Sequence, residues 1–102
     1  MRIPRHPTLM RRMRDARLKE LVARCPPLAA SLGRQLSGQW HVTLKRAGKT
    51  RTVYVPAALR KEVQASIQEH RRLRRLVAEI TELQLALIRS HRMGQARRGG
   101  RG

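Results

Sequence analysis

The sequence predicts a mainly α-helical protein with a small β-hairpin. Two antiparallel helices, one of them about 35 residues long, are expected on either side of a two-stranded hairpin in the chain. Three observations support this fold class. A long stretch without proline or glycine carries one apolar stripe, a segment with period-two alternation precedes it, and a shorter amphipathic stretch lies near the N-terminus.

The long helix is predicted to run from Pro56 to about Met93. Proline suits a helix start because its missing N–H would have no helical partner there. Apolar residues recur at steps of three and four, namely Leu59, Val63, Ile67, Leu73, Leu76, Val77, Ile80, Leu83, Leu87 and Ile88. A helix of this length cannot bury such a stripe alone, so we expect an antiparallel partner helix, a second copy, or both.

The shorter helix is predicted over residues 9–24, with Thr8 as its cap and Pro26-Pro27 as its end. Its looser apolar stripe consists of Met10, Met13, Leu18, Leu21 and Val22. Residues 28–32 are expected to add a short helical turn that Gly33 stops.

The hairpin is predicted from alternation in residues 40–45 and from the β-branched residues of 50–55. Ala47-Gly48-Lys49 supplies the turn, in which Gly48 can take a positive φ. Because isolated two-stranded hairpins are marginally stable in water, we expect this one to lie on the helices.

Charge is the most unusual property of this 102-residue chain, since 24 Lys and Arg against 6 Asp and Glu give a formal net charge of +18. Such a chain attracts polyanions, and nucleic acid is the predicted partner, although GC-rich coding would produce the same bias without function. The predicted phosphate contacts lie at the hairpin tip, in the long helix and in the C-terminal tail: Lys45, Arg46, Lys49, Arg51, Arg71, Arg72, Arg74, Arg75, Arg97, Arg98 and Arg101. The alternative for the helix and tail residues is an ordinary solvated surface.

Residues 1–93 are predicted to form a single domain, and residues 94–102 a disordered basic tail rich in Gly and Arg. The single cysteine, Cys25, excludes an intramolecular disulfide and fits a reducing compartment. No apolar run approaches the roughly 20 residues of a membrane span, and no signal-peptide segment is present, so a cytoplasmic protein is expected.

The sequence offers no catalytic, metal or cofactor constellation. The carboxylates occupy scattered, surface-type helical positions, and nothing in their spacing forces two of them together. Cys25 and His41 could begin a zinc site, but structural zinc needs four ligands at a recognisable spacing. A helix-turn-helix is excluded by Pro26-Pro27, so contact with the phosphate backbone, of DNA rather than RNA, is the expected mode.

The segments WHVTLKRAGKTRTVYVPAALRKEV and EHRRLRRLVAEITELQLALI resemble a family of small bacterial proteins of unknown function that are commonly encoded beside transposase genes. The resemblance covers residues 39–92, and its distinctive part is the junction of residues 52–56, TVYVP. Family members carry three closely spaced cysteines before the hairpin, whereas residues 33–40 of this chain have none. The resemblance implies a mobile-element setting.

Two functional hypotheses follow from these observations. The first is a non-enzymatic, basic accessory protein that contacts nucleic acid and is linked to a mobile element. The second is a coiled-coil scaffold or adaptor whose partner is a protein, such as a transposase or a second copy of this chain. The length of the apolar stripe favours the second, because it exceeds what the shorter helix can cover.

Overall fold

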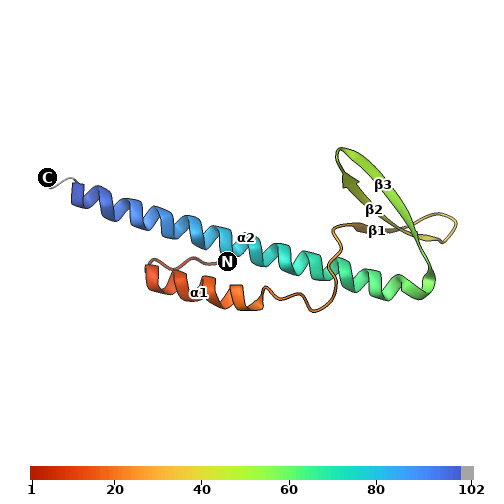
Figure 1. Cartoon of the computed structure of the whole chain (residues 1–102), viewed down its shortest axis with the longest axis horizontal. Helices are drawn as coiled ribbons and strands as arrows, with labels where there is room; N and C mark the ends of the chain where they lie inside the picture. The colour runs from red at the N-terminus through yellow and green to blue at the C-terminus, as the bar shows by residue number, and fades with distance from the viewer. Residues whose placement is uncertain (100–102) are drawn as a thin grey trace. The chain divides into compact units, whose positions relative to one another are not determined.

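The computed structural model describes the backbone of residues 1–99 and the burial of residues 1–94 (Figure 1). In chain order its elements are α1 (Pro7–Glu20), β1 (Ser31–Arg34), β2 (Trp40–Arg46), β3 (Lys49–Val55), the 3-10 turn η1 (Ala57–Leu59) and α2 (Arg60–Gly99). Two helices and an intervening antiparallel sheet confirm the predicted class, mainly helical with a β element.

The chain forms two compact units that share α2. The helical unit contains Met1–Val22 and the part of α2 that begins at Arg74, and the sheet unit is Ala23–Leu73. The single domain expected for residues 1–93 stays a prediction.

In the helical unit, α1 packs antiparallel to α2, as predicted. Arg17 Nε donates to Glu79 Oε2 at 2.7 Å, and the earlier Arg14 donates to the later Gln84 at 2.9 Å. The residue that is earlier in α1 contacts the residue that is later in α2, so the two helices run antiparallel. Between the helices, Met10, Leu76 and Leu83 are buried, and Leu83 has no exposed surface.

Both ends of α1 differ from the sequence prediction. The cap is His6, not Thr8: its side chain accepts a hydrogen bond from the Thr8 amide at 3.2 Å, with Pro7 opening the helix. The helix ends at Glu20, where the Leu21 amide turns back to the Leu18 carbonyl at 3.2 Å. The chain therefore leaves the helix well before Pro26-Pro27, and Val22 is exposed.

The sheet has three strands in the order β1-β2-β3, all antiparallel. The predicted hairpin of β2 and β3 is confirmed, with Arg46 opposite Lys49 and positive φ at both turn residues, 52° at Ala47 and 78° at Gly48. The helical turn expected at residues 28–32 is wrong, because Leu32 pairs with Val42 in β1. Strand pairing with β2 and packing of the half-buried Leu32 against the core cluster outweigh the helical preference of its Leu- and Ala-rich neighbourhood.

The core of the sheet unit lies where one sheet face meets the N-terminal part of α2. The segment before β1 is fixed to this helix by a backbone hydrogen bond of 3.0 Å from the Leu28 amide to the Ser66 carbonyl. Val42, Val55 and Ile67 form the buried cluster, and Leu28, Ala30, Leu32, Trp40 and Val63 pack against it.

The helix α2 begins at Arg60 and not at Pro56 as predicted, because residues 57–59 form the 3-10 turn η1, of which Pro56 is the N-cap. The helix continues through Gly94, beyond the expected end at Met93. Arg101 and the side chains of Arg97 and Arg98 lie outside the described residues. The predicted stripe is only partly buried, because Leu59, Val77 and Ile88 are exposed. No helix within the described residues is long and apolar enough to cross a membrane.

Two leucines of α2 allow a matched test of the helical packing. We expect Leu83→Ala to lower the free energy of unfolding by about 2–4 kcal/mol, because it leaves a cavity at a fully buried position. Leu85→Ala, at a position 40% exposed on the same helix, should cost less than about 1 kcal/mol. Urea unfolding followed by circular dichroism measures both values, and equal losses would contradict the assigned packing.

Candidate nucleic-acid interface

Most cations of the sheet unit lie on a stretch of chain without carboxylates. Between Glu20 and Glu62 the sequence contains eight Lys and Arg residues and no Asp or Glu. All three strands lie in this stretch. The sheet therefore has no negative side chain of its own that could neutralise its basic residues.

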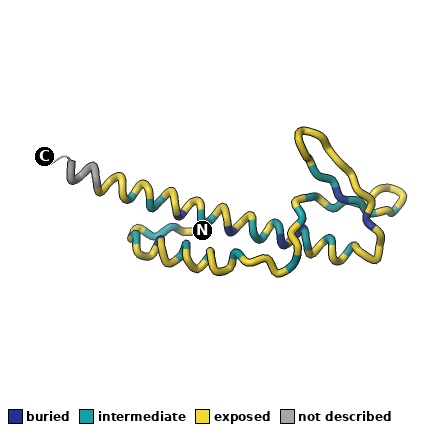
Figure 2. Tube along the Cα trace, viewed as in Figure 1, coloured by how far each residue is buried: buried dark blue, intermediate teal, exposed yellow. Residues whose placement is uncertain are grey.

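The strand register sorts the basic residues of the hairpin tip between the two sheet faces. Side chains of directly opposed residues share a face, so the pairs Arg46–Lys49 and Leu44–Arg51 place Arg46, Lys49 and Arg51 together. Lys45, one residue away, lies on the opposite face. All four are exposed, and Figure 2 shows the tip of the hairpin as exposed. The structure gives their side chains no hydrogen bond or ion pair within the described residues.

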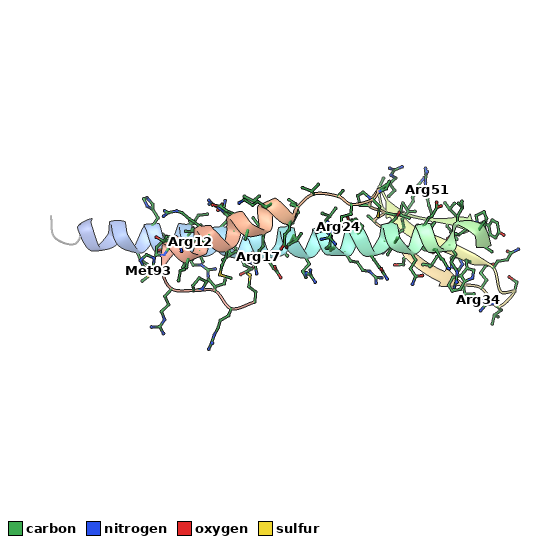
Figure 3. All side chains as sticks on the ribbon, turned by 90° about the horizontal axis from the view of Figure 1, so that it is seen from below. Arg12, Arg17, Arg24, Arg34, Arg51 and Met93 are labelled. Carbon is green, nitrogen blue, oxygen red and sulfur yellow. The ribbon has the colours of Figure 1, made fainter. Side chains whose placement is uncertain are left out.

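A second group of cations surrounds Trp40, at the other end of the sheet. Arg34 is the cross-strand neighbour of Trp40 in β1, and its guanidinium carbon lies 5.5 Å from the centre of the indole ring. The guanidinium carbon of Arg60, the first residue of α2, lies 5.1 Å from the same centre. Both distances are typical of cation–π contacts. Arg34 and Arg51 project from separate parts of the sheet (Figure 3).

Trp40 also lines a pocket of about 270 Å³ between the sheet and α2. One α2 face forms the helical side of the pocket, because residues 64, 67, 68 and 71 recur at helical spacing. The lining residues are Leu32, Trp40, Gln64, Ile67, Gln68 and Arg71. Of the arginines that the sequence predicts to contact phosphate, Arg71 is the one that this pocket includes.

Sequence reasoning missed Trp40, Arg34, Arg60 and the two glutamines of the pocket as site residues. The spacing of Gln64, Gln68 and Arg71 indicates a common helix face, so this part was recoverable from the sequence. The position of Trp40 over that face depends on tertiary packing, which no spacing within the helix reveals.

Arg72 is not the outward-facing residue that the sequence predicts. Its Nε donates to Glu69 Oε1 at 2.6 Å, and its side chain is only 17% exposed. Glu69 is itself buried, although its spacing suggested a surface position. Its carboxylate also accepts the backbone N–H of Arg24. Glu69 therefore attaches the chain before β1 to α2, and the charge of Arg72 is neutralised within the sheet unit.

The same contacts set the acidity of Glu69. The hydrogen bond from the Arg72 side chain lowers the pKa of Glu69 most, and the Arg24 and Cys25 amides lower it further. Together they outweigh the effect of burial and bring the pKa from 4.5 to about 2. The carboxylate is consequently ionised throughout the neutral and mildly acidic range.

Arg74 and Arg75 belong to the helical unit. Arg75 lines a hollow of about 240 Å³ that also includes Glu20 and Glu79, so its surroundings are partly acidic. Glu79, four residues further along α2, pairs with Arg17 of α1. The structure thus divides the predicted run of arginines into residues with different surroundings.

Cys25 and His41, the two residues considered for a zinc site, contact different parts of the sheet unit. The Cys25 sulfur lies 3.8 Å from the Ala65 carbonyl oxygen on α2. His41 packs over Gly33 on the sheet face opposite Trp40, where a Cβ on Gly33 would lie 3.1 Å from its ring. Within the described residues, no three His, Cys, Asp or Glu side chains group so that they could hold a metal.

Comparisons of the chain with protein-family models, with curated proteins and with solved structures find no significant match. The resemblance to transposase-associated bacterial proteins therefore stays a prediction.

The lowered pKa of Glu69 predicts how stability depends on pH. A carboxylate with a depressed folded-state pKa stabilises the protein above its unfolded pKa, and this contribution is lost as pH falls from about 4.5 to about 2. We expect the melting temperature to fall over this window. In Glu69→Gln the melting temperature should already be lower at pH 7 and fall less on acidification.

Thermal unfolding by circular dichroism between pH 7 and 2 tests this expectation. The control is Glu62→Gln, which changes an exposed carboxylate on the same helix and should preserve the wild-type pH profile. A Glu69→Gln profile with the wild-type drop between pH 4.5 and 2 would contradict the proposed role of the carboxylate.

Proposed function

We propose that this protein is a non-enzymatic nucleic-acid-binding accessory protein that contacts the phosphate backbone, of DNA in preference to RNA. The observation that carries the proposal is the hairpin tip, where four exposed cations stand on a sheet without carboxylates. Cations that no carboxylate neutralises can replace the counterions of a polyphosphate, and release of these counterions supplies affinity.

The distribution of ion pairs supports this assignment. Ion pairs of the described residues include Arg14–Asp15 within α1, Arg17–Glu79 between α1 and α2, and Arg72–Glu69 within α2. Paired arginines stabilise the fold, whereas the hairpin cations have no structural partner within the described residues. The basic surface of the sheet unit is therefore free to meet an external anion.

The proposed setting is a cytoplasmic protein linked to a mobile element. The resemblance of residues 39–92 to transposase-associated bacterial proteins supports this link, and the content of a single cysteine fits a reducing compartment. The proposed mode is backbone contact rather than base reading in the major groove, because neither helix is presented by a helix-turn-helix.

The salt dependence of binding tests the role of the hairpin. Replacing Lys45, Arg46, Lys49 and Arg51 together by Gln should reduce the slope of log affinity against log salt by up to about four, since each lost phosphate contact removes about 0.9 for duplex DNA. Fluorescence anisotropy with a labelled duplex at several salt concentrations measures the slope.

The matched control replaces four exposed cations of the helical unit, Arg2, Arg5, Arg11 and Arg12, by Gln. This variant loses the same total charge, and we expect its slope to stay near that of the wild type. An unchanged slope in the hairpin variant, or an equal reduction in both variants, would remove the hairpin from the proposed interface.

A specific observation favours a second function, that of a scaffold or adaptor. Val77, Leu85 and Ile88 are between 40% and 62% exposed, and their spacing places them on one face of α2. An apolar helix face of this kind is suited to a protein partner, which would be a second copy or a transposase.

Analytical ultracentrifugation tests self-association at this face. At micromolar concentration we expect a mass above that of the monomer, and the variant Leu85→Glu with Ile88→Glu should return to the monomer mass because carboxylates oppose burial of the face. A wild type that is strictly monomeric and does not bind a transposase would contradict the scaffold function.

A further inference from the structure

The pocket beside Trp40 has a composition that backbone contact does not require. Leu32, Trp40 and Ile67 contribute apolar atoms to its lining, and Gln64, Gln68 and Arg71 contribute the polar side chains, which supply most of its accessible surface. A surface that only neutralises phosphates needs cations and no hollow lined by an indole and two amides. A hollow in which an indole and aliphatic groups adjoin amide groups can hold a small ring that carries hydrogen-bonding groups at its edge.

The volume of the pocket limits what it can hold. At about 270 Å³ it lies below the roughly 300–1,000 Å³ of sites that enclose drug-sized ligands, so it suits a group of one or two rings. Glutamine amides both donate and accept hydrogen bonds, which matches the edge of a nucleobase. Arg71 adds a positive charge at the pocket, and Arg34 and Arg60 add two more around the indole ring.

We propose that this pocket binds one unstacked nucleobase of a single-stranded nucleic acid, with Gln64 and Gln68 at the base edge and Arg71 at a flanking phosphate. This inference rests on the proposed nucleic-acid binding and names its substrate class. Bases in a duplex are stacked and paired, so only a single strand, a loop or a frayed end offers a base to such a pocket. The hairpin tip supplies backbone contacts that do not distinguish single strands from duplexes.

The intrinsic fluorescence of Trp40 allows base binding in the pocket to be tested. Trp40 is the single tryptophan of the chain, so fluorescence excited at its absorption edge reports on the pocket alone. A titration of the full chain uses three probes of equal length: oligothymidylate, the same strand with abasic residues, and a duplex. A parallel titration with oligouridylate distinguishes DNA from RNA as the source of the base.

We expect saturable quenching of Trp40 with the base-bearing strands and little quenching with the abasic strand. The duplex should bind without comparable quenching. Contact of the base with the pocket lining and hydrogen bonds at its edge predict that oligothymidylate binds about tenfold more tightly than its abasic counterpart. Equal affinities and equal fluorescence changes for the base-bearing and abasic strands would overturn the proposal.

Variants separate the pocket from the hairpin. Gln64→Ala with Gln68→Ala changes two exposed side chains, so the fold should be retained, as circular dichroism verifies. This variant should lose most of the preference for oligothymidylate over the abasic strand while keeping its affinity for duplex. The fourfold Gln variant of the hairpin should instead weaken all probes alike and keep that preference.

The outcomes for the two proposals are distinguishable. Binding of abasic strand and duplex without any base-dependent preference overturns the pocket assignment and leaves backbone contact standing. Failure of every probe to bind at low salt overturns the proposed nucleic-acid binding and the pocket assignment with it. Retention of the full preference for base-bearing strands in the double Ala variant also counts against the named glutamines.

Discussion

The sheet unit depends on one buried carboxylate. Glu69 binds the Arg72 guanidinium on its own helix and the Arg24 amide of the segment that leads to β1. This segment lacks regular structure, and its amides need partners when they leave water. By supplying one, Glu69, together with the Ser66 carbonyl that accepts from Leu28, fixes where the chain approaches β1. The position of Leu32 in the pocket wall follows from this attachment.

Much of the fold could be predicted from local pattern. The hairpin was recognisable because its alternation and Gly48 agree with the register found, and α2 because Pro56 and an uninterrupted apolar stripe mark it. The end of α1 and the third strand were not recoverable in this way. Both depend on residues distant in sequence, since Arg24 is held by Glu69 and Leu32 is paired with Val42.

Part of the candidate site could likewise be predicted from local sequence, and part of it depends on tertiary packing. The cations of the hairpin tip could be named from the sequence, because a tight turn exposes whatever side chains flank it. The different surroundings of Arg71 and Arg72 could not be predicted from the sequence. Neighbouring positions on a helix point in different directions, and only the packed structure shows which side of the helix the sheet covers. Arg71 lines the pocket, whereas Arg72 forms an ion pair with Glu69.

The turn of the hairpin places an alanine in a conformation that usually favours glycine. Ala47 occupies the left-handed region at φ 52°, where a residue with a Cβ is less comfortable than glycine or asparagine by about 1 kcal/mol. The ribbon that displays Arg46 and Lys49 is therefore closed by a turn of less than maximal stability. The separation of these two charges is therefore set by a turn in which an alanine takes a conformation that glycine or asparagine would adopt at lower cost.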